Sequence, residues 1–356
     1  MSPRGRPKQE NEVQAPVGKK GDFVGTLGDI NKTYGKGTII QLGKRRPPVI
    51  SFSTGCFSLD LMLNGGFPRG MITELFGPEG GGKSTMALTT TGIAQTQGEN
   101  AAYVDVEHAL NPKYAEDLGV NVNTLAITQP DNGETALQIV ETLIDSGDVG
   151  IIVVDSVAML VPRAEIEGEI GDANVALLPR LMGQALRKLT PKVRKQNVAL
   201  IFINQLRETI DSFGYGEKTK TTGGRALKHQ ASLRLDVRRI AALKVGEKIV
   251  GARVRAKNPK SRISNPFQEV EFDLIYGKGI DREADILDMA AKMKIVSKDG
   301  SWYNFGDERI GQGRFATCNA LRGNRELYGA IRGLVIEQTA NGASTEPEEQ
   351  GEPVDQ

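Results

Sequence analysis

The chain has 356 residues with a net charge of +1, and 39% of the residues are hydrophobic. These values suit a globular protein with one large domain and a smaller companion. The only two cysteines, Cys56 and Cys318, match no metal-binding spacing and exclude a disulfide-rich secreted scaffold, so we expect free thiols and a cytoplasmic location. The longest apolar stretch, residues 149–161, is interrupted by Asp155 and Ser156 and is too short to span a bilayer, so we predict no membrane association.

The N-terminal region combines a polar extension with one amphipathic segment. Residues 1–20 are rich in Pro, Lys, Arg and Gln and predict a disordered basic segment. Residues 23–34 place apolar side chains at helical spacing and are followed by Gly35, which predicts a helix. We assign residues 21–50 to this helix and a linker. A lone helix needs a partner surface, so we expect this region to contact another subunit.

Residues 51–279 alternate apolar runs of strand length with helical patterns. Strands that are apolar on both faces and separated by helices predict an α/β fold with a mostly parallel central sheet covered by helices. Ligands of such sheets bind at the carboxyl ends of the strands. Shorter helices and turns predict a small C-terminal α+β domain over residues 280–338, and a run of acidic residues predicts a disordered tail over 339–356.

A phosphate-binding loop follows the apolar run at residues 71–76. The sequence Gly-Pro-Glu-Gly-Gly-Gly-Lys-Ser fits the pattern G-x-x-x-x-G-K-[ST] of P-loop NTPases. Its glycines let backbone N–H groups approach a phosphate, and the partial positive charge at the N-terminus of the next helix attracts the same phosphate. Lys83 should reach the β and γ oxygens of the nucleotide, and Ser84 should ligate Mg²⁺. The nucleotide-binding residues predicted here are Gly77, Pro78, Glu79, Gly80, Gly81, Gly82, Lys83, Ser84 and Thr85.

Polar residues end the other strands of the predicted sheet. Asp155 is placed to hold the water shell of Mg²⁺, although an acid here could instead cap the next helix. Glu107 could polarise the attacking water, and Asp105, on the same face of the same strand, is an equal candidate from composition alone. Gln205 can donate and accept hydrogen bonds, so it could sense the γ-phosphate or simply satisfy a loop backbone.

Cations concentrate in the second half of the chain. Between Glu217 and Arg262 there are fourteen Lys or Arg residues and three acids. Apolar residues alternate with the cations in the sequence ASLRLDVRRIAAL at residues 231–243, which predicts a strand with one basic face. A basic middle and an acidic tail indicate a polyanionic partner, whereas a solvated face is the alternative.

Several longer motifs resemble the bacterial RecA recombinase family. They include STGCFSLDLML, DVEHALNPKYAEDLGV, AEIEGEIGD, FINQLRETI and TTGGRALKHQASLRLDVRR, and the resemblance extends from about Gly21 to Leu334. It implies a RecA-type core that binds ATP and Mg²⁺, a DNA-dependent ATPase activity, and a helical filament on single-stranded DNA that pairs with a homologous double-stranded DNA. It also implies recombinational repair and stimulation of self-cleavage of a LexA-type repressor in the SOS response.

The resemblance assigns roles to residues around the nucleotide. Glu107 looks like the catalytic glutamate, with Lys83 in support, and Gln205 looks like the γ-phosphate sensor. Tyr114 is similar to the tyrosine that stacks on adenine. Lys260 and Arg262 match two cations that cross the subunit interface to the γ-phosphate. Three features depart from the family pattern, namely Asn111, His229 and a longer segment at residues 255–263.

The resemblance also implies two DNA-binding loops. Residues 163–172 resemble the first loop, and residues 207–222 resemble the second. Glycines in such loops let backbone amides approach phosphates, and aromatic side chains such as Phe213 and Tyr215 could stack on bases. The DNA-binding residues predicted are Arg163, Glu165, Gly168, Arg187, Arg207, Phe213, Gly223, Gly224 and Arg225.

Two other functions are consistent with these motifs. The first is a scaffold whose filament mainly serves as a platform for protein partners. The second is a motor or signalling ATPase that forms closed rings, which the single ATPase core and the N-terminal helix disfavour because they suit open head-to-tail contacts.

Overall fold

The computed structural model describes residues 22–39, 49–169, 176–208 and 219–343. The chain divides into two units, residues 1–48 and residues 49–356. The first unit contains α1 (Phe23–Tyr34), which confirms the predicted helix. The side chain of Asp22 caps this helix by accepting a hydrogen bond from Gly25 N at 2.8 Å. No residue of α1 is buried, so a role in subunit contact stays a prediction.

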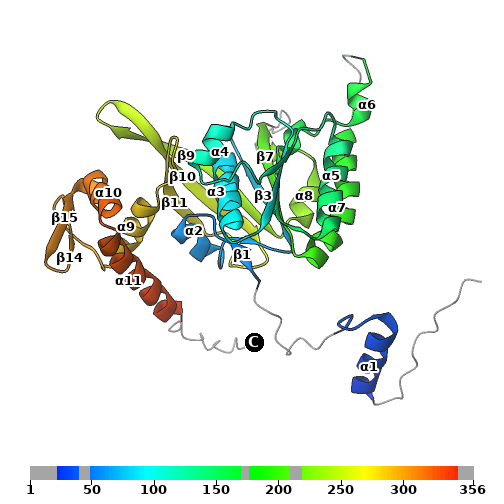
Figure 1. The fold of residues 1–356 in the computed structure, drawn as a ribbon, viewed down its shortest axis with the longest axis horizontal. Helices are drawn as coiled ribbons and strands as arrows, with labels where there is room; N and C mark the ends of the chain where they lie inside the picture. The colour runs from blue at the N-terminus through cyan, green and yellow to red at the C-terminus, as the bar shows by residue number, and fades with distance from the viewer. Residues whose placement is uncertain (1–21, 40–48, 170–175, 209–218, 344–356) are drawn as a thin grey trace, which may run out of the picture. The chain divides into compact units, whose positions relative to one another are not determined.

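The second unit is built on one large sheet (Figure 1). Its described strands are ordered β12-β11-β10-β9-β3-β7-β6-β4-β5, and β8 pairs with β7. Six of the described strands run parallel to one another, which confirms the mostly parallel sheet; they are β9, β3, β7, β6, β4 and β5. The strands are β3 (Met71–Gly77), β4 (Asn100–Asp105), β5 (Ala126–Thr128), β6 (Val149–Asp155), β7 (Ala199–Glu208), β8 (Thr219–Thr221), β9 (Leu233–Val245), β10 (Lys248–Ser261), β11 (Glu269–Ile275) and β12 (Gly279–Ile280).

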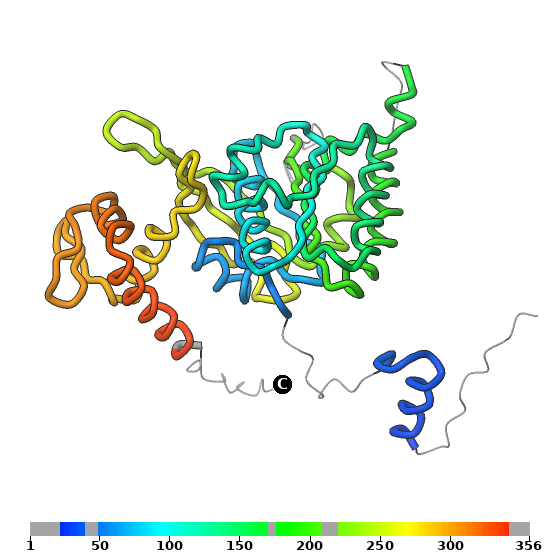
Figure 2. The backbone as a smooth tube through the Cα atoms, viewed as in Figure 1, coloured from blue at the N-terminus to red at the C-terminus, as the bar shows by residue number. Residues whose placement is uncertain are grey.

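Strands β10, β11 and β12 extend this sheet in antiparallel fashion. The alternation of helices and strands did not predict them, because they are joined by turns without intervening helices. Figure 2 shows that the connected ends of β9 and β10 project from the body of the sheet as a hairpin. A separate two-stranded sheet joins β1 (Ser51–Phe52) to β2 (Phe67–Pro68).

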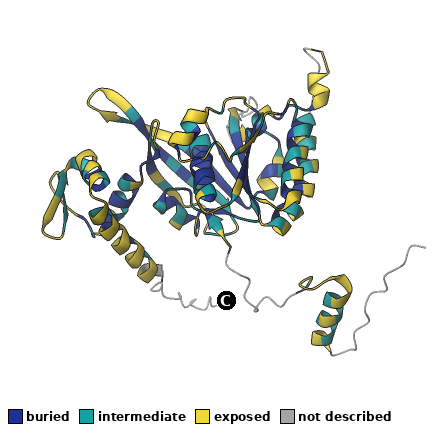
Figure 3. Cartoon of the chain, in the orientation of Figure 1, coloured by how far each residue is buried: buried dark blue, intermediate teal, exposed yellow. Residues whose placement is uncertain are grey.

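Helices cover both faces of the large sheet, and Figure 3 shows its strands as the most buried part of the unit. One face packs against apolar side chains of α2, α3 and α4. The other packs against α5, α7 and α8. These helices are α2 (Phe57–Met62), α3 (Lys83–Thr96), α4 (Pro112–Asp117), α5 (Gly133–Ser146), α7 (Leu177–Gln196) and α8 (Arg225–Gln230), and short turns η1 (Val157–Met159) and α6 (Arg163–Ile166) follow β6. Because side chains alternate along a strand, successive residues face different helical layers.

The C-terminal part of the unit has its own apolar core. It contains α9 (Arg282–Lys292), α10 (Gly313–Gly323) and α11 (Arg325–Ala343) beside a sheet of β13 (Ser297–Asp299), β14 (Trp302–Phe305) and β15 (Glu308–Gln312). Helix α11 continues to Ala343, past the end we predicted for this domain at residue 338, so residues 339–343 are helical and not part of a disordered tail. None of the helices in the described residues is both long and apolar enough to cross a membrane.

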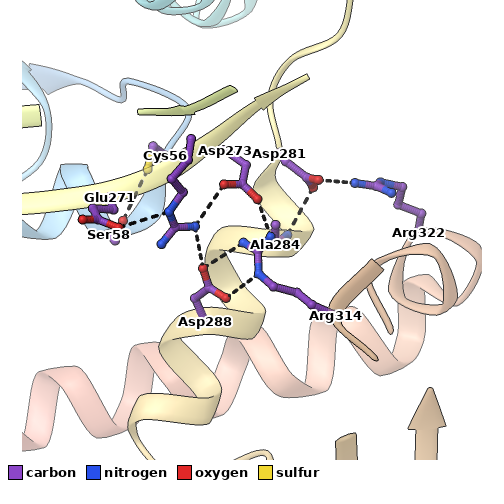
Figure 4. Close-up of polar contacts among 10 residues, drawn as sticks. Cys56, Ser58, Glu271, Asp273, Asp281, Ala284, Asp288, Arg314 and Arg322 are labelled. Carbon is purple, nitrogen blue, oxygen red and sulfur yellow. Dashed lines mark hydrogen bonds and ion pairs between the residues drawn. The ribbon is translucent and has the colours of Figure 1, made fainter. Parts of the chain in front are cut away.

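Ionic contacts join this C-terminal part to the large sheet (Figure 4). Arg253 on β10 donates to Asp273 on β11 and to Asp288 on α9, both at 3.0 Å. Arg314 on α10 donates to the same two carboxylates, and two of these bonds reach Asp288 at 2.8 Å. Burial raises the pKa of Asp288, but Arg314 and Arg253 outweigh this effect and hold the pKa below its ordinary value. Residues from four elements therefore meet in one charged cluster.

Candidate nucleotide-binding site

The predicted phosphate loop leaves β3 and enters α3, as its sequence requires. Gly77, Gly80 and Gly82 have φ angles of +151°, +66° and +95°, which residues with a Cβ rarely adopt. A Cβ on Gly77 would lie 2.1 Å from the carbonyl oxygen of Val237 on β9. The loop is therefore pressed against the neighbouring strand, and glycine is required by contact as well as by backbone conformation.

Lys83 is the first residue of α3 and is buried, with 7% exposure. Its Nζ donates to the carbonyl oxygens of Gly77 at 3.0 Å and Pro78 at 2.7 Å. Burial lowers the pKa of Lys83, and the carboxylates of Asp155, Glu107, Glu79 and Asp236 act in the opposite direction. The ammonium group is held at the mouth of the loop, where the nucleotide phosphates would replace these carbonyls.

A carboxylate and two hydroxyl groups meet beside the start of α3. Ser84 Oγ donates to Asp155 Oδ2 at 2.7 Å, and Tyr103 OH donates to the same oxygen at 2.6 Å. Burial raises the pKa of Asp155, the two hydroxyl groups lower it, and the carboxylates of Glu107 and Asp105 raise it again. Hydroxyl and carboxylate oxygens are the ligands that Mg²⁺ prefers, so the side chains present here fit the predicted roles of Ser84 and Asp155 in holding this ion.

Glu107 lies two residues beyond the end of β4, and not at the end of the strand as we predicted. Its carboxylate is exposed and accepts hydrogen bonds from Gln205 Nε2 at 3.0 Å and from Ser156 Oγ. The alternative, Asp105, is 2% exposed and accepts bonds from Ala109 N, Leu110 N and Gln129 Nε2. Asp105 thus holds its own loop together, which leaves Glu107 as the carboxylate open to a water molecule.

Tyr114 lies on α4, and its hydroxyl group is 2.7 Å from Thr85 Oγ1 on α3. This contact brings the predicted adenine-stacking residue beside the phosphate loop. Asn111 caps α4 by accepting a hydrogen bond from Tyr114 N at 3.1 Å. Asn and Asp serve equally well as helix N-caps, so this departure from the family pattern preserves the local structure.

Lys260 and Arg262 are not brought to the phosphate loop of the same chain. Lys260 Nζ donates to the carbonyl oxygens of Lys228 and His229 at the end of α8, both at 2.8 Å. Burial lowers the pKa of Lys260, and the neighbouring charges of Arg262 and Arg234 lower it further. The backbone N–H of Arg262 donates to Ser232 O at 2.9 Å. Their predicted contact with a nucleotide requires a second subunit.

The predicted DNA-binding residues are partly described. Arg163, Arg187, Arg207 and Arg225 are exposed, as are Glu165 and Gly168. Gly223 and Gly224 have φ angles of +79° and +74°, and a Cβ on either residue would lie 2.9 Å from a neighbouring side chain, Val157 or Pro179 respectively. The close packing and the positive φ angles explain why both positions are glycine. Phe213 and Tyr215 lie outside the described residues, as do residues 170–172 of the first loop and 209–218 of the second.

No role was predicted from the sequence for three polar residues near the site. Tyr103, Ser156 and Asn204 contact Asp155, Glu107 and the backbone of Gln205, respectively. An apolar strand pattern does not distinguish a polar residue that supports a site from one with a structural role. The available signal was position, because Ser156 and Asn204 are adjacent in sequence to Asp155 and Gln205. His108 and His229 are exposed, and the described residues contain no group of three or more His, Cys, Asp or Glu side chains that could hold a metal by themselves.

Comparison with known protein families decides the class of the chain. Residues 23–281 match the family model of the RecA N-terminal domain, and residues 284–340 match that of the RecA C-terminal domain. The chain belongs to the RecA family. Protein RecA of Clostridioides difficile (strain 630) is 50% identical over 303 residues, covering 85% of this chain and 87% of the relative.

Other members of the RecA family are similar over comparable lengths. Protein RecA of Geobacter sulfurreducens is 50% identical over 314 residues, which cover 87% of this chain and 93% of the relative. Among solved structures, the RadB recombinase is 26% identical, with a TM-score of 0.49 over 64% of this chain and 98% of its own.

Proposed function

We propose that this chain is an ATP-dependent recombinase that forms a filament on single-stranded DNA and pairs it with homologous double-stranded DNA in repair. The observation that carries this proposal is the 3.0 Å hydrogen bond from Gln205 to Glu107. Gln205 lies near the end of β7, and the segment that resembles the second DNA loop begins two residues later, at Arg207. Gln205 therefore contacts the predicted catalytic carboxylate and belongs to the strand that continues into the predicted DNA-binding loop.

Hydrolysis follows from the placement of the charged groups. Glu107 orients a water molecule and accepts its proton as the water oxygen attacks the γ-phosphorus. The bond from phosphorus to the β–γ bridging oxygen breaks, and its electron pair leaves with ADP. Lys83 and the loop N–H groups stabilise the charge on the phosphate oxygens. When bound, Mg²⁺ neutralises the β and γ phosphates beside Ser84 and Asp155. Gln205 exchanges its bond to Glu107 for one to the γ-phosphate.

A neighbouring subunit completes the proposed site. Lys260 Nζ is held by two backbone carbonyls at the end of α8, and burial together with the neighbouring charge of Arg262 lowers the pKa of Lys260. Such a pair is stabilised by an anion, and the γ-phosphate of an adjacent subunit supplies one. Loss of that phosphate would weaken both the subunit contact and the hold of the loop on DNA.

The proposal is tested by measuring ATP hydrolysis with and without single-stranded DNA. Glu107→Gln should bind ATP and DNA like the wild type but hydrolyse ATP about a hundredfold more slowly, because the water loses its base. Lys83→Ala should lose ATP binding. Glu116→Gln makes the same chemical change on an exposed part of α4 and should hydrolyse ATP normally. Wild-type turnover in Glu107→Gln, or no stimulation of the wild type by DNA, would contradict the proposal.

A further inference from the structure

A chain of buried polar contacts crosses three strands beside the nucleotide site. Arg234 on β9 forms an ion pair with Glu74 on β3, and the exposures of their side chains are 8% and 0%. The other oxygen of Glu74 accepts a hydrogen bond from Asn204 Nδ2 on β7 at 2.9 Å. Asn204 Nδ2 also donates to Thr222 O at 3.1 Å, and Asn204 Oδ1 accepts a bond from the hydroxyl of Thr222. The proposed hydrolysis uses none of these four residues.

These contacts lie on the face of the sheet opposite the nucleotide. Side chains alternate along β7, so Asn204 shares a face with Leu200 and Phe202, which pack in the core with α7 and α8. Gln205 points to the other face, where it meets Glu107. The two neighbours are joined directly, because Gln205 N donates to Asn204 Oδ1 at 2.9 Å. A movement of Gln205 toward a phosphate therefore acts on the Asn204 amide.

Asn204 also joins the two ends of the segment that resembles the second DNA loop. It lies in β7, which enters the segment, and its amide holds both the hydroxyl and the carbonyl of Thr222 at the exit. Its amide oxygen and nitrogen each serve two partners, so its hydrogen-bonding capacity is filled. Among the described residues, Glu74 alone bonds this amide to β3, the strand that ends in the phosphate loop.

We propose that Glu74 is a positioning residue that couples the nucleotide site to the second DNA loop by holding the Asn204 amide, with Arg234 as the cation that allows the carboxylate to be buried. This inference rests on the proposed function. An isolated buried carboxylate is costly, and its pairing with Arg234 removes most of that cost. The coupling itself requires only that residue 74 offers an oxygen that accepts the hydrogen bond from Asn204 Nδ2.

The experiment separates the acceptor from the ion pair with two double variants. Glu74→Gln with Arg234→Met removes both charges and keeps an acceptor for Asn204, whereas Glu74→Leu with Arg234→Met removes the acceptor too. Replacing a whole buried ion pair by apolar residues usually preserves folding. Arg69→Met with Glu99→Leu removes another ion pair at the opposite end of β3 and serves as the control.

The readout is the ratio of two dissociation constants for a poly-dT oligonucleotide, without nucleotide and with a slowly hydrolysed ATP analogue. We expect the Glu74→Gln double variant and the control to keep the wild-type ratio within about twofold. In the Glu74→Leu double variant the ratio should be about tenfold smaller than in the wild type. Affinity for the analogue without DNA should be unchanged in all three. A wild-type ratio in the Glu74→Leu variant, or an equal loss in both Glu74 variants, overturns the inference. If ATP does not change DNA affinity in the wild type, the proposed function itself fails.

Discussion

At the scale of single residues, the chemistry depends on how the surroundings of a few carboxylates differ. Asp155 has two hydroxyl donors, whereas Glu107 lies in the open and is held by an amide and a hydroxyl group. Asp60 on α2 is partly buried outside the site, and its oxygens accept bonds from Ser53 and Thr54. The carboxylate group thus has three environments and, we expect, three roles.

Tyr103→Phe should weaken Mg²⁺ binding without removing a proposed ligand. The variant deletes the 2.6 Å hydrogen bond that orients Asp155, and loss of such supporting bonds commonly costs tenfold or more in metal affinity. We expect the Mg²⁺ concentration that half-saturates ATP hydrolysis to rise about tenfold. Tyr276→Phe, an exposed tyrosine after β11, provides the comparison. An unchanged Mg²⁺ requirement would mean that Tyr103 only fills space.

Asp60 should make stability fall as the pH rises from about 4 to about 6. Burial raises the pKa of Asp60 from 3.8 to about 6, although bonds from Ser53 and Thr54 oppose the shift. In this window the folded chain keeps a proton that the unfolded chain releases, so ionisation costs up to about 3 kcal/mol. Asp60→Asn has no such proton. The urea midpoint of Asp60→Asn should therefore rise relative to that of the wild type as the pH increases from 4 to 7. A difference between the two midpoints that does not change with pH would refute the assignment.

Sequence reasoning at this scale succeeded where a motif fixes the position of a group. The phosphate-loop pattern placed Lys83 and Ser84, and the end of an apolar run placed Asp155 beside them. It could not separate Asp105 from Glu107, because their difference in burial arises from the loop after β4 and not from the strand. It also missed Glu74, since a carboxylate inside an apolar strand gives no sign of its distant partner Arg234.

At the scale of elements, tight contacts between neighbouring segments decide which residues are allowed. The turn from β3 into α3 passes so close to β9 that its first glycine faces the Val237 carbonyl. The strand β9 itself was predicted, but its basic face is smaller than the charge count suggested. Arg234 is buried against Glu74, and Arg238 pairs with Asp236 at 2.8 Å, so neither is free for a polyanion.

Gly77→Ala should be far more harmful than an alanine at another glycine with positive φ. Its Cβ would lie 2.1 Å from a backbone oxygen, so the loop or β9 must shift. We expect the free energy of unfolding to fall by about 3 kcal/mol and ATP binding to be lost. Gly98 has a φ of +85° and open space around its Cβ, so Gly98→Ala should cost only about 1 kcal/mol. Urea denaturation checks both values, and equal losses would show that backbone conformation alone matters.

At the scale of the whole molecule, the chain combines a sheet that carries the nucleotide site with a C-terminal part attached by charge. The family match and the mostly parallel sheet agree with the fold expected from the alternating pattern. The attachment could not be foreseen, because Arg253, Asp273, Asp288 and Arg314 come from separate elements that only the folded chain brings together.

Arg314→Met should weaken this attachment. Asp273 is 2% exposed and would keep only Arg253 as a partner, and unpairing a buried carboxylate is destabilising. Because Arg314 itself is partly exposed, we expect a loss of about 2 kcal/mol in the free energy of unfolding. The exposed Arg332 on α11 supplies the control, Arg332→Met, which should be neutral. An unchanged stability of Arg314→Met would show that the apolar contacts of α9 suffice.

The central claim is that ATP bound at the phosphate loop drives the pairing of DNA strands. Strand exchange between a circular single strand and a homologous linear duplex tests it most directly. The account predicts joint molecules with the wild type and ATP, and none without nucleotide or with Lys83→Ala. A wild type that coats DNA in the presence of ATP but never exchanges strands would contradict the account and favour a filament that serves only as a scaffold for partners.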